Sequence, residues 1–106
     1  MQRWTLTLAD HEHPLSAQPG DSILVRLDET PGTGYRWAVD GNMPPTLTLE
    51  SSDLLLPAAS GIGGGGQRTF SFRIDQPGEA RLQLKLWREW EGERSVLKRF
   101  AVVIHA

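Results

Sequence analysis

The stretch RLQLKLW, residues 81–87, alternates apolar and polar side chains along its whole length. Its three leucines fall on one side of an extended chain, whereas Lys85 and Trp87 fall on the other. Helical periodicity is hard to find in this stretch or elsewhere in the chain. The pattern predicts a β-strand with one buried face and one face turned to solvent.

The same alternation recurs along the chain, and turn-forming residues separate the runs. The further runs are RWTLTL (3–8), SILVRL (22–27), LTLES (47–51), RTFSFRI (68–74) and FAVVIHA (100–106). The turns are Pro19-Gly20-Asp21, Asp40-Gly41-Asn42, Pro77-Gly78 and Glu91-Gly92. Short strands with regular turns predict an all-β protein built from two packed sheets. We expect an immunoglobulin-like antiparallel β-sandwich of about seven to eight strands, without the cysteine pair of antibody domains.

Composition bounds the size of the protein and its partners. A chain of 106 residues suffices for one core, so we expect a single β-sandwich domain over residues 1–106. The net charge of −2 gives no reason to expect nucleic acid or an anionic membrane as a partner. No apolar run approaches the roughly 20 residues of a membrane span. We expect a monomer without cofactors.

The compartment stays open at this stage. The first residues, MQRWTLTLAD, lack the basic-then-apolar pattern of a signal peptide. The absence of cysteine excludes disulfides and thiolate metal sites, but a domain with an adequate core folds without disulfides in any compartment. We expect a periplasmic or secreted protein if a leader was removed, and a cytoplasmic protein otherwise.

A glycine run at residues 61–66 formally fits the dinucleotide-binding pattern G-x-G-x-x-G. That pattern binds pyrophosphate because a helix follows it and directs its N-terminal amides at the phosphates. Here QRTFSFRI follows, and this segment alternates as a strand. The run is therefore either a flexible linker between strands or a binding loop whose backbone approaches a partner closely.

Metal binding and catalysis also lack support. His11-Glu12-His13 would place two imidazoles on one side of an extended segment, but zinc needs further ligands. The only other histidine, His105, lies at the far end of the chain, so a solvated turn is expected. No G-x-S-x-G motif occurs, and Glu89, Glu91 and Glu93 have the spacing of a solvated hairpin. We expect no metal site and no catalytic residue.

The four tryptophans divide into core and surface residues. Trp4 lies on the apolar side of its strand, and Trp37 follows a glycine-rich loop beneath which we expect it to pack. Trp87 lies on the polar side of its strand, and Trp90 lies among charged residues. Indoles in such places are enriched at interaction hot spots, so Trp90 is expected to be a binding residue. The alternative is that Trp90 folds back over the edge of the sandwich.

Three segments rich in glycine or tryptophan interrupt the strand pattern. They read Thr30-Pro31-Gly32-Thr33-Gly34-Tyr35, then Gly61-Ile62-Gly63-Gly64, then Arg88-Glu89-Trp90. Their order resembles the chagasin family of cysteine-protease inhibitors, whose motifs are N-P-T-T-G-[YF], G-x-G-G and R-P-[WF]. The chain differs at Thr30, Gly32 and Glu89, where the family motif has asparagine, threonine and proline.

The resemblance implies a reversible, tight-binding inhibitor of papain-like cysteine proteases, and not an enzyme. All residues of the three segments would then bind the protease, as loops at one end of the sandwich. The loop around Thr33 would enter the active-site cleft. Arg88 and Trp90 would grip one wall of the cleft, and the backbone of Gly61 to Gly64 the other.

Two other functions compete with this interpretation. A carbohydrate-binding or adhesive β-sandwich would use Trp87 and Trp90 as stacking platforms. It would account for exposed indoles, but not for the glycine run or for the Pro-Gly-Thr-Gly loop. A subunit of a larger assembly would instead use free sheet edges.

Overall fold

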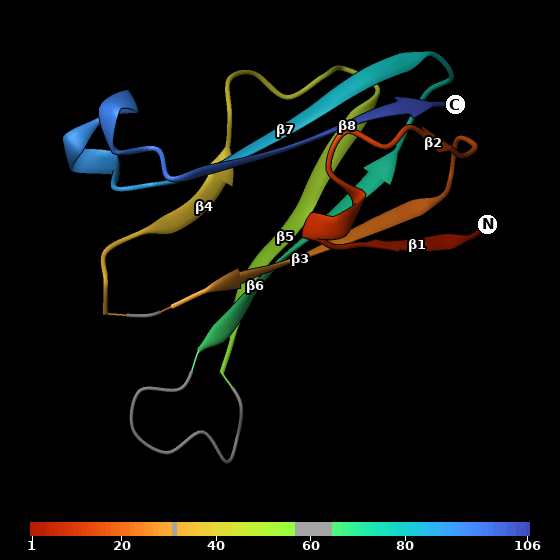
Figure 1. Cartoon of the computed structure of the whole chain (residues 1–106). Coiled ribbons are helices and arrows are strands. Elements are labelled where there is room, and N and C mark those ends of the chain that lie inside the picture. Colours follow the sequence, from red (N-terminus) through yellow and green to blue (C-terminus); the bar gives the residue numbers. More distant parts are fainter. Residues whose placement is uncertain (31, 57–64) are drawn as a thin grey trace.

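The computed structural model describes residues 1–30, 32–56 and 65–106, which form two four-stranded sheets (Figure 1). The strands are β1 (Arg3–Leu6), β2 (Leu15–Ser16), β3 (Ser22–Glu29), β4 (Arg36–Val39), β5 (Leu47–Leu55), β6 (Gly66–Ile74), β7 (Glu79–Trp87) and β8 (Lys98–His105). The first sheet has the order β1-β3-β6-β5, and the second sheet has the order β2-β8-β7-β4. The predicted all-β sandwich is confirmed.

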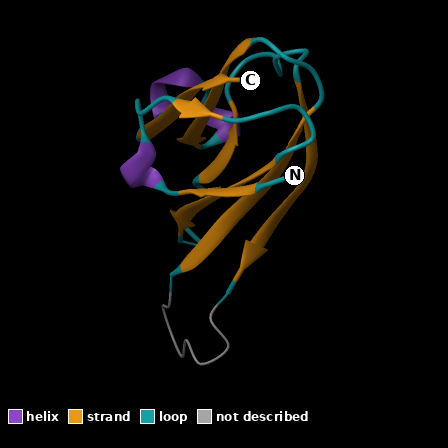
Figure 2. Ribbon diagram, turned by 90° about the vertical axis from the view of Figure 1, so that its right-hand side faces the viewer, coloured by secondary structure: helices purple, strands orange, loops and turns teal. Residues whose placement is uncertain are grey.

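Among the described residues, helical structure is limited to three short 3₁₀ turns, η1 (Leu8–Asp10), η2 (Glu89–Glu91) and η3 (Glu93–Ser95). Figure 2 shows that strands and loops make up nearly all of the described chain. No helix among the described residues is long and apolar enough to span a membrane. Both chain ends lie on the side of the molecule away from η2 and η3 (Figure 1).

The core lies between the sheets and is built from the apolar side of each alternating run. The side chains with almost no exposure are Ile23, Val25, Leu27, Phe72, Ile74, Leu82, Leu84, Phe100, Val102 and Ile104. Each such burial contributes about 1.5–3 kcal/mol of transfer free energy. The alternation that predicts the strands therefore also supplies the main stabilising term of the sandwich.

Both sheets are mixed, because their short edge strands pair in parallel. β1 runs parallel to β3, and β2 runs parallel to β8, whereas the remaining pairs are antiparallel as predicted. Parallel neighbours need a crossover connection. Here the chain leaves β1 in the first sheet, adds β2 to the second sheet, and returns to the first sheet as β3.

The first strand ends earlier than the alternation of RWTLTL predicts. Leu8 was expected on the apolar face of that strand, but it begins η1 and is 41% exposed. The carboxylate of Asp10 accepts a hydrogen bond from the backbone N–H of Thr7 at 2.8 Å. This bond favours the 3₁₀ turn over further extended chain.

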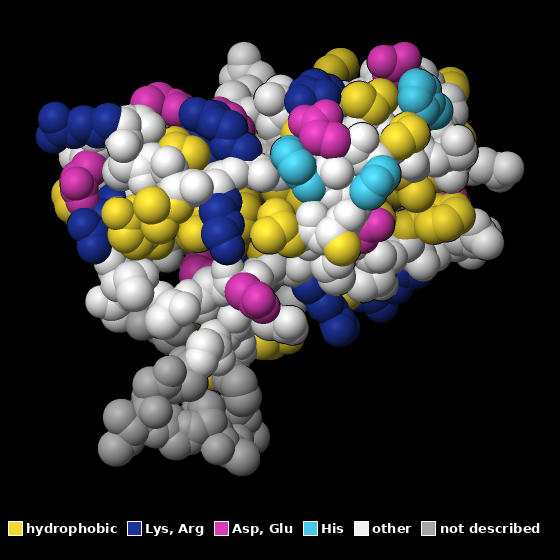
Figure 3. All heavy atoms as spheres, in the orientation of Figure 1, with side chains coloured by type: hydrophobic (Ala, Val, Ile, Leu, Met, Phe, Trp, Pro, Cys, Tyr) yellow, Lys and Arg dark blue, Asp and Glu magenta, His cyan; other side chains and the backbone are white. Residues whose placement is uncertain are grey.

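The histidine segment forms the turn that the sequence predicts, at residues 11 and 12. Glu12 has a φ of 63°, and its N–H donates to the carbonyl of Ala101 at 2.7 Å. The Nδ1 atom of His11 accepts a hydrogen bond from the Ala101 N–H at 3.0 Å. On the face of the molecule drawn in Figure 3, histidine side chains gather at the end away from η2 and η3. No group of three potential metal ligands occurs in the described part of the chain.

Asp21 ties the N-terminal segment to the start of β3. This residue is only 4% exposed, and its carboxylate accepts hydrogen bonds from the N–H groups of Gln2 and Gln18 at 2.8 and 3.1 Å. The indole N–H of Trp4 donates to the same carboxylate at 3.1 Å. Trp4 packs against the core as predicted, but it is only partly buried because its polar edge reaches Asp21.

This arrangement predicts acid sensitivity of the fold. Hydrogen bonds, first from the Gln2 backbone and then from the Trp4 indole, lower the pKa of Asp21 below its ordinary value of 3.8. A carboxylate with a lowered folded-state pKa stabilises the fold above about pH 4, and this stabilisation is lost as the pH falls through the folded pKa. Asp21→Asn is expected to lower Tm at pH 7 and to flatten the fall of Tm below about pH 4. Parallel Tm–pH curves for the two proteins would contradict this role.

Candidate functional site

The loop between β3 and β4, residues 30–35 (the first loop), is closed by the hydroxyl group of Thr33. This group donates a hydrogen bond to the Thr30 carbonyl at 2.9 Å and accepts one from the Tyr35 N–H at 3.2 Å. Gly32 and Gly34 have φ angles of 87° and 84°. Residues with a β-carbon rarely adopt such angles. The shape of the first loop therefore depends on one hydroxyl group and two glycines.

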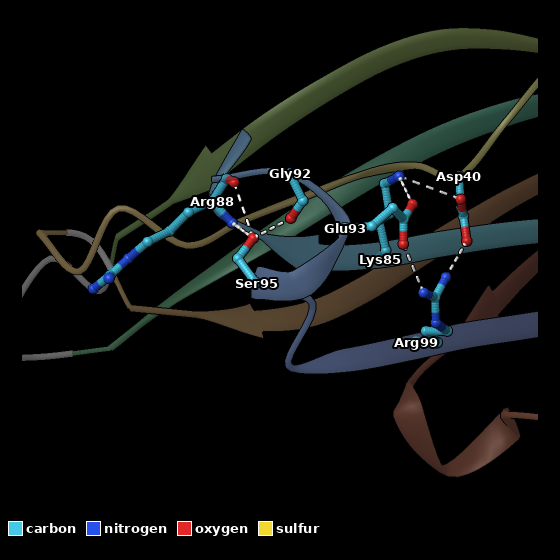
Figure 4. A network of polar contacts seen from close by, with 7 residues as sticks. All are labelled: Asp40, Lys85, Arg88, Gly92, Glu93, Ser95 and Arg99. Atoms are coloured by element: carbon cyan, nitrogen blue, oxygen red, sulfur yellow. Dashed lines mark hydrogen bonds and ion pairs between the residues drawn. The ribbon is translucent and has the colours of Figure 1, made fainter. Parts of the chain in front are cut away.

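The connection between β7 and β8, residues 88–97 (the third loop), joins two antiparallel neighbours, as the predicted hairpin requires, and it contains η2 and η3. The hydroxyl of Ser95 accepts a hydrogen bond from the Arg88 N–H at 3.0 Å (Figure 4). The same hydroxyl lies 2.9 Å from the Arg88 carbonyl and 2.6 Å from the Gly92 carbonyl, and its one proton serves either of them. Ser95 thus closes the third loop as Thr33 closes the first.

The guanidinium group of Arg88 joins the two loops. Its Nε and Nη2 atoms both donate to the Thr33 carbonyl, at 3.2 and 3.0 Å, and its Nη1 atom donates to Glu91 at 3.1 Å. The guanidinium carbon lies 4.3 Å from the centre of the Tyr35 ring, a cation–π distance. The structure therefore brings the first and third predicted segments together at one end of the sandwich.

Trp90 lies over the first loop. A β-carbon at Gly34 would lie 2.6 Å from Cη2 of Trp90, so a larger residue at this position would displace the indole. The Trp90 side chain is nevertheless 73% exposed. This exposure agrees with a surface residue and not with one folded back over the sandwich. Apolar side chains lie among basic and acidic ones at the end of the molecule that carries η2 and η3 (Figure 3).

A groove of about 740 Å³ opens beside the two loops. Its lining includes Tyr35, Trp87, Glu89 and Trp90. Trp37 also lines the groove, is 5% exposed and packs into the core, which agrees with the prediction that it packs beneath the first loop. Its indole N–H donates to the carbonyl of residue 28 at 2.9 Å.

The sequence does not predict the buried ion pair beneath the first loop. Glu29 is 3% exposed and lies 2.7 Å from Nη2 of Arg68. Its other oxygen accepts hydrogen bonds from the Trp37 N–H at 2.7 Å and from Nε of Arg68 at 3.2 Å. Glu29 therefore joins the end of β3 to the start of β4 and so fixes both ends of the first loop. Its position on the apolar phase of β3 was the signal that could have revealed it.

Lys85 and Trp87 lie on the outward side of β7, but the third loop covers them. Lys85 is only 7% exposed, so the prediction that it faces solvent is wrong. Its ammonium nitrogen lies 2.6 Å from Glu93 of the third loop and 3.7 Å from the centre of the Trp87 ring. Lys85 thus covers one face of the Trp87 indole. Of Trp87 and Trp90, only Trp90 therefore has a largely exposed ring.

The second predicted segment, with Gly61, Ile62, Gly63 and Gly64, lies outside the described residues, as does Pro31. The strands on either side of the second segment are described. A pocket lies where the chain leaves β5 and enters β6. Its lining includes Leu55, Leu56, Gly65 and Gly66, and Thr30 of the first loop lines it as well. The chain therefore enters and leaves the second segment beside the first loop.

Residues 16–104 match the sequence model of the family described as Chagasin family peptidase inhibitor I42. The chain belongs to this family. Chagasin from Trypanosoma cruzi is 24% identical over 106 residues, which cover 95% of this chain and 96% of that protein. The resemblance that the three sequence motifs indicate is confirmed.

Solved structures agree with the chagasin-family fold. The cysteine protease inhibitor EhICP2 from Entamoeba histolytica aligns with a TM-score of 0.88 and 24% identity, covering 99% of this chain and 96% of its own. PbICP-C, solved in complex with falcipain-2, aligns with a TM-score of 0.62 and 16% identity, covering 97% of this chain and 88% of its own. Membership of the chagasin family makes this protein a peptidase inhibitor and not an enzyme.

Proposed function

We propose that this protein inhibits papain-like cysteine proteases reversibly and tightly, by placing all three predicted segments across the active-site cleft. The observation that carries this proposal is the interlocking of the first and third loops, in which Arg88 holds the Thr33 carbonyl and Trp90 covers Gly34. Loops that are ordered before binding lose less entropy on binding. Family membership supports inhibition, and the description of EhICP2 as a cysteine protease inhibitor supports the class of protease.

The first loop would enter the cleft with Thr33 at its tip and remain uncut. Cleavage requires a peptide bond aligned with the attacking nucleophile. Here two donors of Arg88 already hold the carbonyl of Thr33, and the φ of 84° at Gly34 takes the chain out of an extended substrate conformation. The loop can therefore fill the cleft without presenting a peptide bond for attack.

Titration of papain with the purified protein tests this function. We expect reversible, competitive inhibition with one inhibitor bound per enzyme, and mass spectrometry of the recovered inhibitor should show an intact chain. Rapid cleavage between residues 31 and 35 would mean that the first loop binds as a substrate. Absence of inhibition across several papain-like proteases would contradict the proposed function itself.

Trp90 should contribute binding energy and little stability. Trp90→Ala is expected to weaken inhibition of papain by about 2 kcal/mol or more, the scale of an interface hot spot. The side chain is 73% exposed, so Tm should change little. Leu97→Ala is the matched control, because Leu97 lies in the same loop and is 58% exposed. A large fall in Tm with unchanged inhibition would show that Trp90 is a structural residue.

A further inference from the structure

A network of charged residues fastens the third loop to the outer face of the second sheet (Figure 4). Its centre is Glu93, whose two carboxylate oxygens lie 2.6 Å from Nζ of Lys85 and 2.8 Å from Nη2 of Arg99. Asp40, directly after β4, lies 3.4 Å from Lys85 and 2.6 Å from Arg99. Glu93 is thus the member of the network that belongs to the third loop, and the other three belong to the sheet or its edge.

The surroundings of Lys85 make the position of Glu93 specific. The Lys85 side chain is 8% exposed and has the Trp87 ring on one side, so water cannot replace a lost carboxylate easily. The hydrogen bond that Lys85 donates to Glu93 raises the pKa of Lys85 against the opposing effect of burial. In return, Lys85 and then Arg99 lower the pKa of Glu93. Both partners are therefore charged at neutral pH, and the buried cation favours the loop conformation that supplies Glu93.

The network is connected to the first loop through short contacts. Glu93 begins η3, and Ser95 ends it. The Ser95 hydroxyl accepts the hydrogen bond from the Arg88 N–H at 3.0 Å, so the backbone of Arg88 follows the position of η3. The Arg88 guanidinium then reaches the carbonyl of Thr33. A displacement of Glu93 would therefore change both the third loop and its support of the first.

We infer that Glu93 is a positioning residue for protease inhibition. It would act through Arg88 and Trp90, by holding the third loop in the conformation that binds, and not by touching the protease. This inference rests on the proposed function. Because 59% of the Glu93 side chain is exposed, salt should screen part of its effect.

Glu93→Gln tests the inference because it keeps the size of the side chain and removes its charge. We expect inhibition of papain to weaken about fivefold to tenfold, the range of a partly screened ion-pair network, mainly through faster dissociation. Amide hydrogen exchange of Gly92 and Ser95 should become faster, while exchange in the core strands stays unchanged. Glu50→Gln is the matched control, since it removes the same charge from an ion pair with Arg73 on the first sheet. This control should inhibit like the unsubstituted protein.

A double variant separates positioning from direct contact. If Glu93 acts through Trp90, then Glu93→Gln should cost much less affinity in a Trp90→Ala background. Full additivity of the two substitutions would mean that Glu93 does not act through Trp90 and would overturn the inference. Equal inhibition by the Glu93→Gln and unsubstituted proteins would overturn it as well. Failure of the unsubstituted protein to inhibit would instead overturn the proposed function, and the inference with it.

Discussion

Gly34→Val is expected to weaken inhibition of a papain-like protease by about a hundredfold or more. Gly34 has a φ of 84°, where a residue with a β-carbon is strained by about 1–3 kcal/mol. The new β-carbon would also lie 2.6 Å from Cη2 of Trp90, so the indole would have to leave its place over the first loop. One substitution thus distorts the first loop and displaces the main exposed aromatic residue of the third.

Gly32→Val separates these two effects. Gly32 has nearly the same φ, 87°, but no described atom beyond its own chain neighbours lies within 4 Å of the position of its β-carbon. It should therefore introduce strain without displacing Trp90 and cost less affinity than Gly34→Val. Thr33→Ser, which keeps the hydroxyl that closes the loop, should cost less than Thr33→Ala. Equal losses at Gly32 and Gly34 would show that the contact with Trp90 contributes nothing to inhibition.

The fold could be predicted because alternation is a local property of the chain. Successive residues of a strand point to opposite faces of the sheet, so Leu82, Leu84 and Leu86 could be assigned together to the apolar, core-facing side from the sequence. The crossover that makes β1 and β2 parallel to their neighbours could not be predicted in this way. It depends on which sheet a short edge strand joins, and no local pattern encodes that choice.

The site could be predicted only in part, because its motifs identify residues and not contacts. The sequence indicates Arg88 and Trp90 as binding residues, but not that Arg88 points at the Thr33 carbonyl. A charged residue on a strand is also predicted to be exposed, and this prediction fails where another segment covers it. Lys85 and Glu29 both occupy regular strand positions, and each is buried because a residue outside its own strand compensates its charge.

Glu29→Ala is expected to lower the free energy of unfolding by about 3–5 kcal/mol, the usual cost of leaving one partner of a buried ion pair alone. The guanidinium group of Arg68, whose side chain is 15% exposed, would lose its counter-charge. The backbone N–H of Trp37 would lose its acceptor at the start of β4. For a domain of this size each kcal/mol shifts Tm by roughly 4–8 °C, so Tm should fall by about 12 °C or more.

Two further variants decide whether the buried pair causes this loss. Glu50→Ala breaks an ion pair in which both side chains are well exposed, at 38% and 49%, and should cost less than about 1 kcal/mol. Glu29→Gln with Arg68→Met keeps an acceptor for the Trp37 N–H and removes both charges, so it should be more stable than Glu29→Ala. Urea unfolding of the variants measures these differences in stability. Titration of papain below the Tm of each variant measures whether the first loop still inhibits. If Glu29→Ala cost no more than Glu50→Ala, the ion pair beneath the first loop would not be what fixes its ends.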